Sequence, residues 1–199
     1  MVETPHTVDL QAGDALFVVD VQNDFLPGGS LAVPDGDQVV PVVNRLIDAF
    51  TRRALPVFAT RDWHPPDHCS FHERGGPWPP HCVAGSAGAG FAPGLRLPES
   101  ATIVSKATTS DEDAYSGFGG TDLEQLLRAA GARRLFVGGL ATDYCVLSTV
   151  KDALARGFEV YLLRDAIRAV DVGSGDGEKA IAEMEQLGAM PLAAAQVRG

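Results

Sequence analysis

The 199-residue sequence has few cysteines and no long apolar run. Three cysteines, an odd and small number, do not make a disulfide framework, so we expect reduced thiols and a cytoplasmic protein. No apolar stretch approaches the roughly 18 residues that a membrane-spanning helix needs. The first fourteen residues also lack the basic start and apolar run of a signal peptide. The sequence therefore predicts no membrane partner.

Positive charge is also scarce. The chain has 16 Lys and Arg against 26 Asp and Glu, a net charge of −10. A nucleic-acid-binding protein needs a basic surface for the phosphate backbone, and the basic residues cluster no further than Arg52-Arg53 and Arg133-Arg134. We therefore expect no nucleic-acid partner. The composition leaves open whether identical chains assemble into a homo-oligomer.

Apolar residues make up 45% of the chain, which is enough for one core, and segments typical of strands and helices alternate along it. The expected strands are 15–19, 56–60, 102–104, 135–138, 160–163 and 190–192. The expected helices are 38–51, 121–130, 143–156 and 178–187. This order predicts a single α/β domain over residues 1–199, a three-layer, doubly wound fold with a mainly parallel six-stranded sheet and helices on both faces. Two irregular stretches, 62–100 and 107–120, are together rich in Gly, Pro, Asp and His, and segments of that length are usually functional.

Chemically active side chains follow four of the predicted strands. Ligands bind beyond the carboxyl ends of the strands in such sheets, so these side chains are expected to share one site. They are the acid Asp20, the acid Asp62 with the histidine His64, the cation Lys106 and the thiol Cys145. The start of a helix and a nearby ammonium both favour the thiolate form of Cys145. Taken alone, Cys145 could equally be a buried apolar residue, and Asp20 a salt-bridge partner of Lys106 without a catalytic role.

The stretch 62–100 supplies ligands for a metal. Asp62 and His64 share a face of an extended segment, and His81 would complete an open Asp/His/His site for zinc, iron or manganese. His68 is either a fourth ligand or a loop residue with local hydrogen bonds, and we favour the latter. Cys69 and Cys82 would instead serve a structural zinc, although their spacing matches no paired Cys-x-x-Cys pattern.

Aromatic residues lie near the same predicted edge. Together they could form a slot in which a flat ligand ring stacks against aromatic side chains. The candidates are Phe25, Trp78, Tyr115 and Phe118. The opposing interpretation is that these rings pack the loops onto the sheet.

Four motifs carry a resemblance to a known family: Val19-Asp20-Val21-Gln22-Asn23-Asp24-Phe25, Asp62-Trp63-His64-Pro65-Pro66-Asp67-His68-Cys69-Ser70-Phe71, Trp78-Pro79-Pro80-His81-Cys82-Val83 and Leu140-Ala141-Thr142-Asp143-Tyr144-Cys145-Val146. The chain resembles the nicotinamidases (pyrazinamidases) of the isochorismatase-like hydrolases over about residues 14–192. The resemblance implies the isochorismatase-like hydrolase fold. It also implies hydrolysis of nicotinamide to nicotinate and ammonia, a step of NAD salvage, and hydrolysis of pyrazinamide to pyrazinoate.

The same resemblance implies roles for individual residues. Asp20, Lys106 and Cys145 would form a catalytic triad, and one divalent metal, with zinc as the first choice, would be bound by Asp62, His64 and His81. The peptide bond before Ala141 would be cis, and the backbone N–H groups of Ala141 and Cys145 would form the oxyanion hole. Nicotinamide would lie between Phe25 and Trp78, with Tyr115 nearby.

Two alternative functions remain at this stage. The same triad could hydrolyse another small amide, such as a carbamoyl or ureido compound. A doubly wound nucleotide-binding module with a structural zinc is the non-enzymatic alternative. The segment Val21-Gln22-Asn23-Asp24 after the first predicted strand counts against it, because it contains no Gly-rich phosphate loop.

Overall fold

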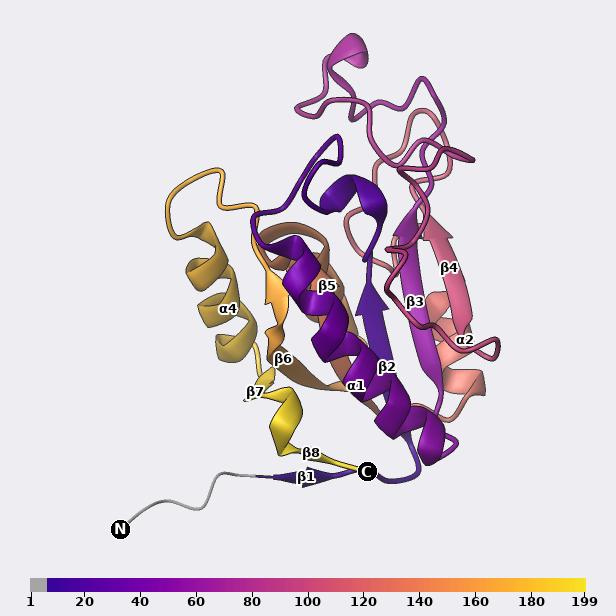
Figure 1. Cartoon of the computed structure of the whole chain (residues 1–199), viewed down its shortest axis with the longest axis vertical. Coiled ribbons are helices and arrows are strands. Elements are labelled where there is room, and N and C mark those ends of the chain that lie inside the picture. Colours follow the sequence, from indigo (N-terminus) through magenta and orange to yellow (C-terminus); the bar gives the residue numbers. More distant parts are fainter. Residues whose placement is uncertain (1–6) are drawn as a thin grey trace.

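The computed structural model describes residues 7–199. Its centre is a six-stranded sheet in the order β4-β3-β2-β5-β6-β7, in which every pair of neighbours is parallel (Figure 1). The strands are β2 (Asp14–Val19), β3 (Val57–Asp62), β4 (Thr102–Lys106), β5 (Arg134–Leu140), β6 (Glu159–Arg168) and β7 (Met190–Leu192). The predicted doubly wound α/β fold with six strands is confirmed.

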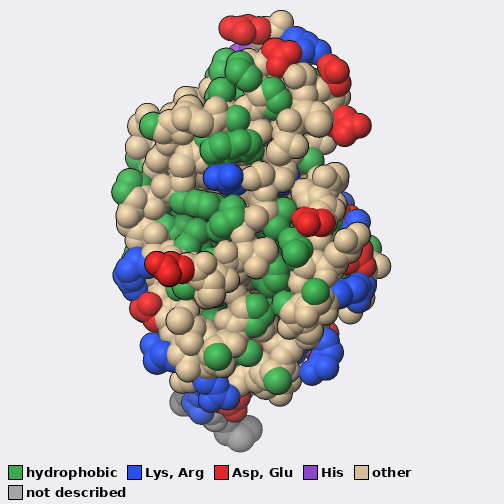
Figure 2. Space-filling view, turned by 90° about the vertical axis from the view of Figure 1, so that its right-hand side faces the viewer, with side chains coloured by type: hydrophobic (Ala, Val, Ile, Leu, Met, Phe, Trp, Pro, Cys, Tyr) green, Lys and Arg blue, Asp and Glu red, His purple; other side chains and the backbone are tan. Residues whose placement is uncertain are grey.

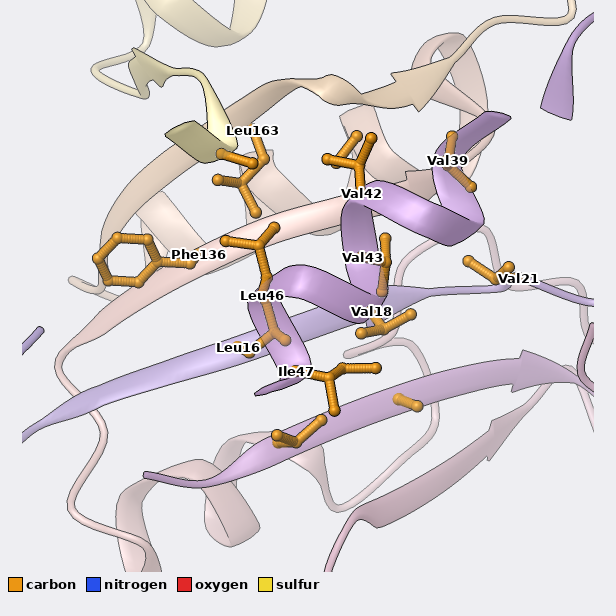
Figure 3. Packing of buried hydrophobic residues seen from close by; sticks show 14 of the residues in the cluster. Leu16, Val18, Val21, Val39, Val42, Val43, Leu46, Ile47, Phe136 and Leu163 are labelled. Atoms are coloured by element: carbon orange, nitrogen blue, oxygen red, sulfur yellow. The ribbon is translucent and has the colours of Figure 1, made fainter. Parts of the chain in front are cut away.

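Helices cover both faces of the sheet. On one face lies α1 (Val39–Arg52), whose apolar residues at spacings of three and four form a stripe that packs on β2, β5 and β6 (Figure 3). In that view Val43, Leu46 and Ile47 of the helix lie over Leu16 and Val18 of β2. The other face is covered by α2 (Leu123–Ala129), α3 (Leu147–Ala155) and α4 (Asp176–Gln186).

One expected helix and one small sheet differ from the sequence prediction. The segment expected as a helix over 143–156 begins instead with a π-helical turn, Thr142–Val146, before α3. A separate two-stranded sheet joins β1 (Val8–Asp9) to β8 (Val197–Arg198) near the two ends of the chain (Figure 1). Two-residue strands are too short to show any periodicity in the sequence.

The carboxyl ends of β2, β3 and β4 point to one end of the molecule, where much of the irregular segments 63–101 and 107–122 lies; the last part of 63–101 runs back along the sheet to the start of β4 (Figure 1). Short 3₁₀-helices interrupt these and neighbouring loops: Asn23–Phe25, Gly36–Gln38 and His72–Arg74, with a further one at Ala194–Gln196 near the end of the chain. The carboxyl ends of β2, β3 and β4 therefore lie together in a single loop-covered region.

The surface carries mixed charge. On the face turned toward the viewer in Figure 2, basic and acidic side chains alternate around the rim, and hydrophobic side chains lie between them. In the part of the chain that the structure describes, no helix is long and apolar enough to cross a lipid bilayer.

Candidate functional site

Lys106, the last residue of β4, is the centre of the site. Its side chain is fully buried, and its ammonium nitrogen lies 3.0 Å from Oδ2 of Asp20 and 3.5 Å from Sγ of Cys145. The same nitrogen donates to the carbonyl of Ala114 at 3.1 Å and forms an ion pair with Oδ1 of Asp62. The structure thus brings the three residues of the expected triad into contact around one cation.

Asp20 lies where the chain leaves β2, and its backbone has a positive φ of 47°. Its carboxylate is completely buried and accepts a hydrogen bond from the hydroxyl of Thr60 at 2.7 Å. Its second oxygen, although 3.0 Å from the Lys106 ammonium, has no partner with hydrogen-bond geometry. Burial raises the pKa of Asp20, and the charge of Lys106 opposes this effect. Such a carboxylate is suited to accepting a proton.

The charge states of Lys106 and Cys145 follow from their neighbours. Burial lowers the pKa of Lys106, but the negative charges of Asp20 and Asp62 outweigh burial and raise it well above its usual value. For Cys145 burial raises the pKa of the thiol; Lys106 opposes this, while the two carboxylates add to it. The net effect raises the pKa of Cys145, whereas the helix start and the Lys106 ammonium, considered from the sequence, favour the thiolate.

The turn that carries Cys145 follows directly from β5. The Leu140–Ala141 peptide bond is cis, as the family resemblance implies. The carbonyl of Ala141 accepts hydrogen bonds from the N–H groups of Tyr144 and Val146, both at 3.1 Å, and these bonds close the π-helical turn. Ala141 and Cys145 both line the pocket described below, so their backbone amides are available candidates for an oxyanion hole.

A second group of side chains fits a divalent metal. Asp62, His64 and His81 are all buried, and one potential ligand atom from each lies within 4.8 Å of the others. Nδ1 of His64 lies 3.0 Å from the carbonyl oxygen of His81, and Nδ1 of His81 lies 2.8 Å from that of Pro79. Because a carbonyl oxygen only accepts, each Nδ1 carries the hydrogen and each Nε2 keeps its lone pair for a metal. An Asp/His/His donor set suits zinc, iron or manganese.

The two histidines are also in the protonation state that a metal requires. Burial lowers the pKa of His64 to about 3, and burial likewise lowers the pKa of His81. Both rings are therefore neutral at pH 7, and a metal ion does not have to displace a proton from either of them.

The depressed pKa of His64 predicts that the metal-free chain loses stability in acid. The unfolded state gains a proton below pH 6.5, whereas folded His64 gains none until about pH 3, so the lost stability grows as the pH falls through that window. We expect His64 to lower the free energy of unfolding by about 2 kcal/mol between pH 6.5 and pH 4.5, with the slope approaching about 1.4 kcal/mol per pH unit at the lower end. Urea unfolding in the presence of a chelator would measure the slope.

A His64→Gln variant should show a shallower loss of unfolding free energy over the same pH range. The control is His72→Gln, because His72 lies exposed on its loop. Equal slopes for the unsubstituted chain and the His64 variant would contradict this prediction.

His68 is hydrogen-bonded to Ser70 and Glu112, outside the group of Asp62, His64 and His81. Its Nε2 lies 3.1 Å from the carbonyl oxygen of Glu112 and must donate, so its Nδ1 accepts from the hydroxyl of Ser70 at 2.7 Å. The ring stacks on His64 at 4.2 Å. His64, His68 and Asp113 also come within 4.8 Å of one another, but in this arrangement no lone pair of His68 remains for a metal. These contacts favour the interpretation of His68 as a locally bonded loop residue.

Among the described residues, the geometry does not support a structural zinc on Cys69 or Cys82. Within residues 7–199, the groups of three potential metal ligands include neither Cys69 nor Cys82. Burial raises the pKa of the Cys82 thiol, which disfavours the thiolate that zinc binds.

A pocket lies beside both Cys145 and the proposed metal ligands, and it is lined largely by apolar and aromatic side chains. Three of the expected residues line it, namely Phe25, Trp78 and Tyr115, together with Asp62, His81, Ala141 and Cys145. The indole N–H of Trp78 donates to the Tyr115 hydroxyl at 3.0 Å, which orients both rings. Phe118 does not belong to the pocket; it is buried in the core beside Phe158 because the chain turns inward at Gly117.

The sequence reasoning missed three lining residues: Leu31, Tyr144 and Val170. The signals for Leu31 and Tyr144 were present, because Leu31 lies in the Gly-rich segment after Phe25 and Tyr144 immediately precedes Cys145. Nothing in the sequence marks Val170, which follows β6. It reaches the pocket because the carboxylate of Asp143 accepts hydrogen bonds from the N–H groups of Val170 and Asp171, both at 2.9 Å.

Comparison with known proteins agrees with this geometry. The family model described as the isochorismatase domain matches residues 14–196. The chain belongs to the isochorismatase domain family. Among other members, the nicotinamidase of Escherichia coli is 41% identical over 196 residues, covering 88% of this chain and 92% of the relative.

Two solved structures are also similar to this chain. The pyrazinamidase of Pyrococcus horikoshii, solved in complex with zinc, is 51% identical with a TM-score of 0.88, covering 91% of this chain and 99% of that chain. PnC1 of L. infantum, solved in complex with nicotinate, is 39% identical with a TM-score of 0.88, covering 96% and 98% of the two chains. The isochorismatase-like hydrolase fold expected from the sequence is therefore confirmed.

Proposed function

We propose that this chain is a metal-dependent cysteine amidohydrolase that converts nicotinamide to nicotinate and ammonia. The observation that carries the proposal is the position of the Cys145 thiol, which lines an aromatic pocket and lies 3.5 Å from a buried lysine that also pairs with Asp20. Most of the pocket lining is apolar, as a flat pyridine ring requires. The nicotinamidase and pyrazinamidase relatives support the same substrate class.

The first half of the reaction is a proton transfer coupled to attack. Nicotinamide lies between Phe25 and Trp78, with its carboxamide carbon facing Cys145. Asp20, whose pKa is raised by burial, takes the proton of the thiol, and the sulfur forms a bond to the carboxamide carbon. Lys106 remains a cation throughout and stabilises the negative charge that moves between carboxylate and sulfur.

The second half releases both products. The N–H groups of Ala141 and Cys145 stabilise the tetrahedral oxyanion. Asp20 returns its proton to the leaving nitrogen, the C–N bond breaks, and ammonia departs from a thioester on Cys145. Water then attacks the thioester carbon while Asp20 accepts a proton from it; the C–S bond breaks, nicotinate leaves, and the proton passes to the Cys145 sulfur.

Asp62, His64 and His81 hold the divalent metal in this proposal, and zinc is the first choice, with iron and manganese as alternatives. A bound ion would supply Lewis-acid chemistry beside the substrate ring. Asp62 connects the two groups, because its carboxylate pairs with Lys106 and lies 3.8 Å from Nε2 of His64. The zinc complex of the Pyrococcus horikoshii relative supports this assignment.

Incubation of the purified chain with nicotinamide tests the proposal through ammonia release. We expect release from the chain as purified, loss of release after treatment with a chelator, and recovery when zinc, iron or manganese is added back. Recovery links the metal to the reaction and excludes irreversible unfolding as the cause of the loss. No release with any of the three metals would refute nicotinamide as the substrate.

The same assay separates the alternative substrates. Pyrazinamide shares the ring carboxamide and is expected to be hydrolysed, whereas carbamoyl and ureido compounds lack a ring for the pocket and are expected to react slowly. A higher kcat/KM for a carbamoyl compound than for nicotinamide would contradict the proposed specificity. A nucleotide-binding module would release no ammonia from any of them.

A further inference from the structure

The carboxamide of Gln22 is fully buried and makes three hydrogen bonds to backbone groups. It follows β2 in the same motif as Asp20. Its Nε2 donates to the carbonyl of Asp62 at 2.8 Å and to that of Ala89 at 2.9 Å. Its Oε1 accepts from the N–H of Asp62 at 2.7 Å. One side chain thus binds both the N–H and the C=O of the same residue.

This double contact replaces a missing part of the sheet. The paired register of β2 and β3 ends at Val18 and Ala59, because the chain of β2 turns away at Asp20. On its other edge Asp62 still pairs in register with Lys106 of β4. Without Gln22, the N–H and C=O of Asp62 on the side of β2 would be buried and unpaired, which is costly for a protein.

We propose that Gln22 is a positioning residue that fixes the backbone of Asp62 and thereby sets the affinity of the metal site. This inference rests on the proposed function, since it assumes that Asp62 binds the metal. The Asp62 carboxylate lies between the Lys106 ammonium and His64, so a shift of its backbone changes both contacts at once. The bond to Ala89 also ties Asp62 to the loop that follows His81.

The test is a Gln22→Glu variant, which keeps the size of the side chain but removes both N–H donors. An acceptor oxygen then faces the carbonyls of Asp62 and Ala89. Competition with a chromogenic zinc chelator measures the dissociation constant of zinc, and we expect it to rise about 10- to 100-fold. A Gln22→Met variant avoids a buried charge and should change the zinc affinity in the same direction.

Asn44 provides a matched control. It lies in α1 with 6% of its surface exposed, its Nδ2 donates to the carbonyl of Gly94, and its Oδ1 accepts from the N–H of Arg96, both at 2.8 Å. Asn44→Asp therefore makes the same chemical change at a buried amide that bonds the backbone of Gly94 and Arg96 and none of the proposed metal ligands. Urea unfolding should show a loss of stability in both variants, with the zinc dissociation constant unchanged in Asn44→Asp.

The outcomes distinguish this inference from the proposed function. If the unsubstituted chain binds no zinc, the metal site itself is refuted and the inference falls with it. If the unsubstituted chain binds zinc and both Gln22 variants bind it equally well, the inference alone is overturned. An equal weakening in Gln22→Glu and Asn44→Asp would also overturn it, because the effect would then be general destabilisation.

Discussion

Replacement of Cys145 by alanine should abolish ammonia release from nicotinamide while leaving zinc binding intact. Among the described residues, the thiol is the only sulfur that lines the pocket, and removal of a nucleophile that acts together with its base typically lowers kcat by about 10⁴-fold or more. Zinc binding should persist because Sγ of Cys145 belongs to neither histidine-containing group of ligand atoms. Single-turnover ammonia release and chelator competition, measured on the same preparation, check both halves of the prediction.

Cys69→Ala is the matched control for the loss of a thiol, because Cys69 lies half-buried on the loop after His64 and is absent from the pocket. It should retain the activity of the unsubstituted chain. An Asp20→Asn variant should be as inactive as Cys145→Ala, since the base and the nucleophile act as one unit. If Cys145→Ala retained most of the activity, the assignment of the nucleophile would be wrong.

Lys106→Met should both inactivate the chain and destabilise it. The substitution removes the cation shared by two buried carboxylates, and breaking a buried ion pair by removing one partner typically costs about 3–5 kcal/mol. Urea unfolding at pH 7 would show this loss. Activity should disappear as well, because the charge that stabilises the ionised Asp20 is gone.

Two further variants serve as controls for Lys106→Met. Lys151 forms an ion pair with Glu183 at 2.6 Å on the surface, with nearly half of each side chain exposed. Lys151→Met should therefore cost less than about 1 kcal/mol. Addition of Asp20→Asn to Lys106→Met should restore part of the lost stability without restoring activity. A Lys106→Met chain as stable as the unsubstituted chain would show that the carboxylates do not depend on this cation.

The fold was predictable because its strands and helices are marked locally. The run Ala15 to Val19 is continuously apolar, as in strands buried on both faces, and the residues from Val39 to Phe50 repeat at helical spacing. Alternation of such segments leaves few topologies. The strand pair Val8–Asp9 and Val197–Arg198 could not be predicted, because short strands are chosen by their partner and carry no pattern of their own.

It was also predictable which side chains would come together at one end of the sheet. Asp20, Asp62, Lys106 and Cys145 lie at or just beyond the ends of parallel strands, and parallel strands end at one edge of the sheet. His64 and His81 could be added from the chemistry of metal ligands. Val170 could not, because it reaches the pocket only through hydrogen bonds to Asp143 from a distant segment.

The amino-acid sequence by itself thus determined the order of strands and helices and the set of candidate site residues that the fold brings together, because both follow from local periodicity and from residue type. Only the tertiary structure decided their chemical states. Burial and the two nearby carboxylates raise the pKa of the Cys145 thiol, and the ammonium of Lys106 opposes them. His68 is bound to Ser70 and Glu112, and Gln22 to Asp62, because loops distant in sequence meet above the sheet and their buried polar groups must be paired.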